Sequence, residues 1–293
     1  MLVAPVRDAA ILHGWLIRAT SSRLRCPNEL SDRVWEPMNQ AIVALVRRHD
    51  PDRFLTARFA PADRRDALLT LYAFNHELAR AREVTTEPHL ALIRLQWWRE
   101  VVEGTRRRHE VATPLSDAIA TGQLLASDLL PIIDAREVEA DPAIETLEAW
   151  RDYLLGGAGG LAVAAGRLLG APDPEALRPF GAAYGAAGIL RSVPALAAQG
   201  RCLLPVDVLA EHGLVPEAVT AGEYPDPVLR RLAMEGKTFL ADARAVRVPR
   251  FAIAAALPVV LARRDLHRFP DVVTQRRFGD RLAVVLAGVT GLL

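Results

Sequence analysis

Hydrophobic residues recur at helical spacing along most of the chain. Leu68, Leu71, Phe74 and Leu78 follow one another at intervals of three or four residues, so they share one face of an amphipathic helix. Runs that alternate polar and apolar residues, and the Asn-Gly dipeptides typical of tight hairpins, are absent from the sequence. The pattern predicts one all-α domain of about ten helices.

Proline and glycine residues mark where these helices begin and end. Pro61 and Pro88 stand just inside two helix starts, where the missing N–H is harmless. Gly104 closes the Pro88 helix, whose apolar positions are Leu90, Ile93, Trp97 and Val101. Further helices are expected to begin near Met38, Thr113, Asp141, Asp173, Asp226, Phe251 and Phe278.

Residues 1–37 do not fit this helical pattern. They lack the charged start, apolar run and cleavage site of a secretory signal, and their acidic residues argue against a transit peptide. We therefore expect two parts, an N-terminal extension over 1–37 and an all-α domain over 38–293. We interpret Met38 as the natural start and the extension as not native or not ordered.

Composition and charge restrict the classes of function. The 293 residues are 51% hydrophobic and carry a net charge of +1, so a large core is expected and a nucleic-acid partner is not. Cys26 and Cys202 have no metal-ligand spacing and form no disulfide framework, which fits a reducing, cytoplasmic location. The longest apolar runs, 251–262 and 282–293, are about half the ~20 residues of a membrane span. We expect no transmembrane span, and a peripheral membrane association stays open.

Two stretches, 71–83 and 188–196, have the layout of a metal-diphosphate site. Carboxylates four residues apart on two facing helices would hold Mg²⁺ between them, and the metal would bind a diphosphate. Here the first pair of positions holds Ala79 and Glu83, and the second holds Ser192 and Leu196. One carboxylate of four remains, and Pro194 is expected to bend or break the second helix. We therefore expect neither a metal site nor a catalytic residue at these four remnant positions.

Several linked motifs resemble the signatures of the squalene/phytoene synthase family. They are Tyr72-Ala73-Phe74, Arg94-Leu95-Gln96-Trp97-Trp98-Arg99-Glu100, the segment 153–159, Ile189-Leu190-Arg191 and the segment 200–205. The resemblance extends from about Arg53 to the C-terminus. It implies an isoprenoid-synthase-like helical bundle around a central cavity.

A divergent branch of this family fits best. Phe74-Asn75-His76-Glu77-Leu78, Arg94–Trp98 and Leu203–Asp207 resemble that branch, which includes a mitochondrial assembly factor for respiratory complex I. The resemblance implies a non-catalytic protein that assists the assembly of an NADH:quinone reductase. Its partner would be a complex I subunit or assembly intermediate. Its place would be the cytoplasm or the surface of the inner membrane, on the matrix side in a eukaryote.

The candidate ligand-binding residues come from the same motifs. They are Tyr72, Phe74, Asn75, Glu77, Arg94, Gln96, Trp97, Tyr153, Arg191 and Arg201. The resemblance places Arg191 and Arg201 where the family contacts diphosphate. Trp97 and Trp98 would line a lipid cavity or belong to the core. We expect Asn75, Glu77 and Gln96 to be buried in a hydrogen-bond network with Arg94 or Arg99. His76, His89 and His212 lack metal spacing and are expected at the surface or as caps.

The loss of carboxylates predicts a neutral to basic cavity mouth. Arg80, Arg82, Arg94, Arg191 and Arg201 would converge there, unless they are ordinary surface arginines. We hypothesise that an anionic or isoprenoid lipid binds directly to arginine with no metal and no cofactor. Two alternatives are a head-to-head prenyltransferase, which would need Mg²⁺, and a lipid carrier without an assembly client. Because only one of the four metal-site carboxylates is present, a non-catalytic protein is favoured over the prenyltransferase.

Overall fold

The computed structural model describes residues 37–83, 87–224, 226–242, 246–269 and 276–293. The chain divides into two units, Met1–Glu36 and Pro37–Leu293, and the second unit contains all the described residues. The expected extension therefore lies outside the described residues up to Glu36, and its status stays a prediction. The first described helix begins at Pro37, one residue before the expected start at Met38.

The described residues form fifteen α-helices and contain no strand, which confirms the all-α prediction. The first eight are α1 (Pro37–His49), α2 (Pro51–Ala57), α3 (Ala62–Glu83), α4 (Pro88–Val102), α5 (Ala112–Ala120), α6 (Ala126–Glu137), α7 (Leu147–Leu154) and α8 (Gly160–Leu168). The others are α9 (Arg178–Ala197), α10 (Val206–Ala210), α11 (Pro216–Thr220), α12 (Asp226–Asp242), α13 (Ile253–Ala256), α14 (Pro258–Arg268) and α15 (Phe278–Thr290). The sequence pattern did not reveal α2, α6, α10 or α11, of which three are seven residues or shorter.

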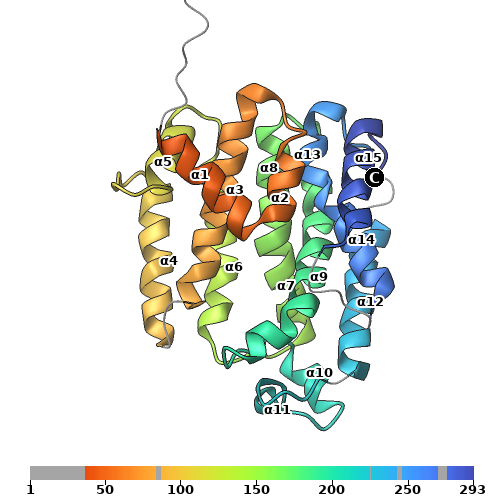
Figure 1. The fold of residues 1–293 in the computed structure, drawn as a ribbon. Coiled ribbons are helices and arrows are strands. Elements are labelled where there is room, and N and C mark those ends of the chain that lie inside the picture. The colour runs from red at the N-terminus through yellow and green to blue at the C-terminus, as the bar shows by residue number, and fades with distance from the viewer. Residues whose placement is uncertain (1–36, 84–86, 225, 243–245, 270–275) are drawn as a thin grey trace, which may run out of the picture. The chain divides into compact units, whose positions relative to one another are not determined.

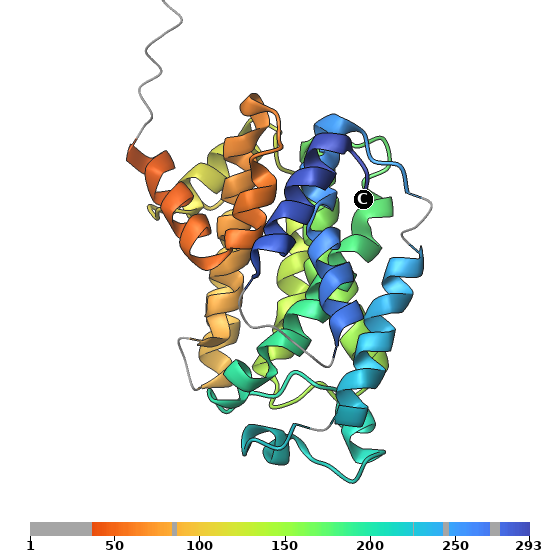
Figure 2. The ribbon, with the colours of Figure 1, turned by 45° about the vertical axis from the view of Figure 1, so that its right-hand side comes forward.

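The long helices stand side by side as an upright bundle (Figure 1). Helix α9 lies in its middle and packs against α7, α8, α12 and α14, while α3 packs against α1, α4, α5 and α8. The short helices α10 and α11 lie at one end of the bundle, and α15 lies on its outside (Figures 1 and 2). Two groups of helices, one around α3 and one around α9, are thus brought together by α6, α7 and α8.

The apolar stripe of α3 forms part of the core. Leu68, Leu71, Phe74 and Leu78 are each at most 2% exposed. Burying one such side chain contributes roughly 1.5–3 kcal/mol, so this stripe alone fixes which way α3 faces. The sequence pattern correctly identified this face.

The buried face of α4 differs from the expected series. Leu90 and Ile93 are 42% and 60% exposed, whereas Leu95 and Trp98 are 2% and 4% exposed. Helix α4 has apolar residues on more than one side, so periodicity alone did not determine which side faces the core. The core side contains Ala91, Leu95, Trp98, Val101 and Val102, so Val101 is buried as expected.

Helix α9 continues through Pro194 and ends at Ala197, so of the expected bend or break, the break is wrong and the bend stays a prediction. Pro194 lies in the last turn, where a missing N–H removes one hydrogen bond and few residues follow. The Pro194 carbonyl still accepts a hydrogen bond from the Ala198 N–H at 3.1 Å.

A π-helical turn, Leu155–Gly159, joins α7 to α8 without a break. Helix α9 approaches this turn so closely that a Cβ on Gly181 would lie 2.1 Å from the Ala158 carbonyl oxygen. A Cβ on Gly185 would lie 2.7 Å from the Ala158 Cβ. The glycines of α9 therefore let its backbone pack directly on the π turn.

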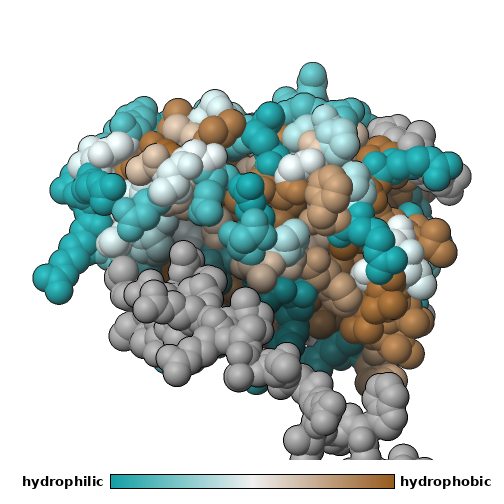
Figure 3. Space-filling view, turned by 90° about the horizontal axis from the view of Figure 1, so that it is seen from above, coloured by the Kyte–Doolittle hydropathy of each residue, from teal (hydrophilic) through white to brown (hydrophobic). Residues whose placement is uncertain are grey.

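Within the described ranges, no helix combines the length and apolar character that crossing a bilayer requires. Seen from above, the surface is mixed in polarity, and hydrophobic side chains gather on its right-hand side (Figure 3).

The substitution Gly181→Ala tests the close contact of α9 with the π turn. The added methyl must push α9 away from Ala158, so we expect a loss of about 1–3 kcal/mol in the free energy of unfolding. Gly188→Ala is the matched control in the same helix, because nothing lies within 4 Å of its added Cβ. The control should gain up to about 1 kcal/mol from helix propensity. Urea denaturation of both variants measures the difference, and equal stabilities would contradict this account of the packing.

Candidate functional site

A cavity of about 220 Å³ opens between the two groups of helices. Helix α9 contributes one wall through Tyr184, Gly188, Ser192 and Leu196, which recur every four residues along one face. Helices α2, α3, α6 and α7, the turn Val138–Ala140, the π turn and the loop after α9 supply the rest of the lining.

Three of the four remnant metal positions line this cavity. Ala79 reaches it from α3, and Ser192 and Leu196 reach it from α9. The fourth, Glu83, ends α3, and its side chain is outside the described part of the chain. The two stretches singled out in the sequence therefore meet in space, although they are more than 100 residues apart.

A buried carboxylate, Glu139, forms the electrostatic centre of the cavity. It is 6% exposed and lies between two arginines. Arg136 Nη1 donates to Glu139 Oε1 at 2.5 Å, and Arg201 Nη2 donates to Glu139 Oε2 at 2.7 Å. The Tyr153 hydroxyl donates to Glu139 Oε1 at 2.7 Å, and Asn75 Oδ1 accepts from Arg136 Nη2 at 3.3 Å. Among the described residues, this cluster contains two guanidinium groups and one carboxylate.

The environment of Glu139 keeps it ionised. Burial on its own raises the pKa of Glu139, but the charges of Arg136 and Arg201 and the hydrogen bond from Tyr153 outweigh burial, so its pKa lies below the ordinary value. The pKa of Tyr153 is raised, first by burial and then by the neighbouring Glu139 carboxylate. Tyr153 therefore remains a neutral hydrogen-bond donor.

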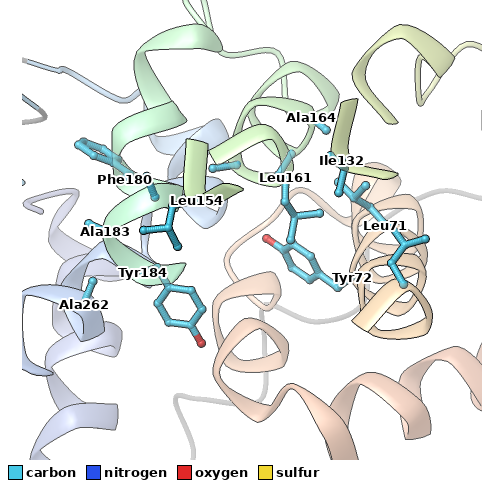
Figure 4. Close-up of a cluster of buried hydrophobic side chains, with 14 of the residues drawn as sticks. Leu71, Tyr72, Ile132, Leu154, Leu161, Ala164, Phe180, Ala183, Tyr184 and Ala262 are labelled. Carbon is cyan, nitrogen blue, oxygen red and sulfur yellow. The ribbon is translucent and has the colours of Figure 1, made fainter. Parts of the chain in front are cut away.

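A third arginine, Arg53 of α2, borders the same cavity. Its guanidinium lies 4.7 Å from the centre of the Tyr184 ring and 5.7 Å from that of the Tyr72 ring, distances typical of cation–π contacts. Figure 4 shows these two tyrosines approaching each other from α9 and α3. Arg53 Nη1 also pairs with Asp50 Oδ2 at 2.9 Å, so part of its charge is already compensated.

Arg191 belongs to a different ion-pair network and does not line the cavity. Its Nη1 lies 2.8 Å from Asp265 Oδ2, and Arg276 bridges Asp265 and Asp52 at 2.7 Å each. The expected convergence of five arginines on one mouth is therefore wrong. Of those five only Arg201 lines the cavity, because the others lie on other faces of α3, α4 and α9.

The remaining candidates divide between the cavity, the core and a second hollow. Asn75 and Tyr153 line the cavity with Arg201. Tyr72 and Phe74 are at most 2% exposed and belong to the core. A hollow of about 290 Å³ on another side of α3 and α4 is lined by Glu77, Ile93, Arg94, Trp97, Trp98 and His109. Whether any of these candidates binds a ligand stays a prediction.

The expected network of Asn75, Glu77 and Gln96 with Arg94 or Arg99 does not form. Asn75 and Glu77 are buried as expected, but Asn75 bonds Arg136, and Glu77 pairs with Arg80 at 3.1 Å. Gln96 is exposed. The reason is the orientation of α4, which turns this part of the helix toward solvent. Arg99 instead pairs with Asp134 and Glu137 of α6.

The histidines form no metal site within the described residues. His76 is half-buried and stacks on His49 with ring centres 4.3 Å apart. Burial, followed by the neighbouring His49, lowers the pKa of His76. His89 and His212 are exposed.

The cavity does not offer the donors that Mg²⁺ requires. Magnesium prefers carboxylate oxygens, but Ala79, Ser192 and Leu196 supply none. Glu139 is the only carboxylate among the described residues that line the cavity, and two arginines already occupy its oxygens. The described donor set therefore fits an anion and does not fit a divalent cation.

Sequence reasoning missed Arg53, Arg136, Glu139 and Tyr184. Helix α6 was not predicted, because Pro131 lies inside it and proline normally interrupts a helix. This helix carries Arg136 and leads directly into the turn that holds Glu139. Tyr184 could have been found, because it precedes Ser192 by eight residues on the same face of α9. No sequence signal marks Arg53 as a cavity residue.

A helical bundle around a central cavity defines the class as isoprenoid-synthase-like, and solved structures share this fold. A dehydrosqualene synthase in complex with ligand superimposes with a TM-score of 0.71 at 14% identity, covering 87% of this chain and 96% of that chain. Squalene synthase HpnC from Alicyclobacillus acidocaldarius gives a TM-score of 0.58 at 19% identity, covering 87% and 94%. Residues 46–281 match the model of the squalene/phytoene synthase family, and the chain belongs to that family.

Curated relatives come from the assembly-factor branch. The chain is 29% identical over 181 residues to the "NADH dehydrogenase (ubiquinone) complex I, assembly factor 6" of Mus musculus, covering 59% of this chain and 54% of that protein. It is 25% identical over 197 residues to the Drosophila melanogaster homolog, covering 63% and 59%. The chain thus spans little more than half the length of these relatives.

The substitution Glu139→Gln tests the buried charge cluster. It leaves Arg136 and Arg201 without their shared carboxylate, so we expect a loss of about 3 kcal/mol in unfolding free energy at pH 7. Because the pKa of Glu139 is lowered in the folded state, its stabilisation is present above the unfolded pKa of about 4.3 and is lost as pH falls through the folded value. The stability gap between wild type and variant should therefore shrink in acid.

Glu137→Gln is the control for this experiment. Glu137 lies two residues away but is 49% exposed and pairs with Arg99 at the surface, so its loss should cost at most about 1 kcal/mol. Denaturant titrations between neutral and acidic pH measure both variants. A pH-independent gap for Glu139→Gln would contradict the assignment.

Proposed function

We propose that this protein is a non-catalytic member of the squalene/phytoene synthase family that assists the assembly of a respiratory NADH dehydrogenase. The proposal that the protein is non-catalytic rests on one observation. Ala79, Ser192 and Leu196 face the cavity at positions where metal-binding carboxylates would be needed. Without those oxygens, the cavity has no group to hold Mg²⁺ against a leaving diphosphate.

The curated relatives support the assembly role. Their names describe complex I assembly factors in mammals and in a fly. The protein would contact a complex I subunit or an assembly intermediate. It would act in the cytoplasm or at the surface of the inner membrane, on the matrix side in a eukaryotic cell.

Deletion of the gene tests the assembly role. We expect less assembled NADH:quinone reductase, measured by native gel and by NADH:quinone activity in membranes. Succinate:quinone reductase activity should be unchanged, because the proposed role is specific to one complex. Normal NADH:quinone reductase would favour a carrier without an assembly client.

An assay with farnesyl or geranylgeranyl diphosphate and Mg²⁺ tests the enzymatic alternative. The structural similarity to a dehydrosqualene synthase keeps a prenyltransferase as the second candidate. We expect no release of pyrophosphate above the background without protein, with an active synthase as the positive control. Release that depends on both protein and Mg²⁺ would establish the alternative.

The ligand proposed for the cavity is an anionic lipid or isoprenoid. Arg136 and Arg201 would hold its head group by charge-assisted hydrogen bonds, in competition with Glu139. Leu154, Ile189 and Leu203 line the apolar part of the cavity and would contact its chain. No metal is part of this binding mode.

The substitution Arg201→Gln tests this ligand. Farnesyl diphosphate serves as the probe in isothermal titration calorimetry, with chelator present throughout. Losing one charge-assisted hydrogen bond of about 1.5–3 kcal/mol should weaken binding roughly ten-fold or more. Arg94→Gln is the control, because Arg94 lines the separate hollow on α4. Binding that requires Mg²⁺, or that Arg201→Gln leaves unchanged, would exclude the proposed mode.

A further inference from the structure

The last helix, α15, is apolar on both its inner and its outer face. Its inner residues Val284 and Ala287 are 0% and 7% exposed, and a Cβ on Gly288 would lie 2.5 Å from the Phe59 ring. Its outer residues are more than one-third exposed: Phe278 80%, Leu282 43%, Val285 37%, Leu286 54% and Val289 56%. A surface helix normally presents polar residues to water. We call these five outer residues the α15 stripe.

The stripe is continuous along the helix. Its members are separated by four, three, one and three residues, so they follow one face over about 17 Å. Helix α15 packs on α14 and α2 from outside (Figures 1 and 2). Hydrophobic side chains gather on this side of the molecule in the view from above (Figure 3).

Ion pairs hold α15 so that the stripe faces outward. Asp280 is 1% exposed and pairs with Arg264 at 2.7 Å and with Arg268 at 2.8 Å, both on α14. Asp280 also accepts a hydrogen bond from the Arg277 N–H at 3.1 Å, which caps the helix. Rolling the stripe inward would break this buried cluster, so its exposure is built into the fold.

The exposed charges along α15 and at its N-cap have one sign. From the N-cap Arg277 to the end of α15, the exposed charged side chains are Arg277 and Arg281, and the only carboxylate in this described segment is the buried and paired Asp280. Arg250 lies beside the end of the helix, where its Nη2 donates to the Val289 carbonyl. The surface therefore combines exposed aliphatic and aromatic side chains with arginine and lacks exposed acid along the helix.

We propose that the α15 stripe docks on the surface of an anionic phospholipid bilayer. An apolar helix face flanked by cationic side chains lies in the interface plane, with its apolar residues among the upper acyl chains and its arginines at the phosphates. Helix α15 lies on the outside of the bundle, so a bilayer surface can reach the stripe (Figures 1 and 2). No transmembrane helix is needed for this attachment.

This inference deepens the membrane-surface location proposed above, but it is independent of the cavity and of its ligand. The stripe residues do not line the central cavity. Loss of vesicle binding through α15 would leave the calorimetric test of Arg201 unaffected, so the two proposals can fail separately.

Flotation with lipid vesicles tests the proposal on the full chain. Wild-type protein should float with vesicles of phosphatidylcholine mixed with phosphatidylglycerol, and less with vesicles of phosphatidylcholine alone. The double variant Leu282→Ser/Leu286→Ser should lose at least ten-fold in partitioning, because it removes the middle of the stripe. Arg281→Gln should lose about five-fold on anionic vesicles only, as expected for one cation at a charged surface.

Met234→Ser is the matched control, because Met234 is a large apolar residue that is 67% exposed on a different helix, α12. It should bind vesicles as the wild type does, and thermal melts should show that every variant is folded. Equal flotation of the double variant and the wild type, or no flotation of the wild type, would overturn the proposal. So would a stripe variant that changes the oligomeric state in sedimentation while vesicle binding stays the same, which would assign the stripe to self-association.

Discussion

The buried ion cluster of Glu139 with Arg136 and Arg201 is the interaction on which the cavity depends. It joins the end of α6 to the loop after α9, and Tyr153 and Asn75 tie α7 and α3 to the same cluster. A buried charge without its partners is strongly destabilising. All four parts of the chain must therefore be in place together, and the cavity is held open by charge as well as by packing.

The same cluster changes what the family's cavity can do. In an active synthase two sets of carboxylates would draw in metal ions, and the metals would hold the diphosphate. Here the described cavity charges are arginines and one carboxylate that they already neutralise. The fold is that of the synthases, but the electrostatics of the site suit direct contact with an anion. Separately from the cavity, the α15 stripe is the proposed contact with the surface of a lipid bilayer.

Sequence reasoning recovered the helical class, the α3 stripe and the two stretches that meet at the cavity. It succeeded where one strong periodicity determined one face, as in Leu71 and Phe74. It failed where two faces were apolar, as in α4, and where a proline concealed a helix, as Pro131 did in α6. Glu139 could not be found in this way, because two of the partners that make a buried glutamate tolerable, Tyr153 and Arg201, stand 14 and 62 positions further along the chain.

The π turn at Leu155–Gly159 takes up one residue more than an ordinary helical turn would, without ending the helix. Removing one residue there would return the segment to ordinary α-helical winding, and α8 would keep nearly the same rotational phase relative to α7. Leu161 and Leu168, at most 3% exposed, would therefore stay on the core side. The contact with α9 would change instead, because Gly181 and Gly185 pack directly on Ala158 in this turn. The wider turn thus matters less for the direction that α8 faces than for the distance at which α9 packs.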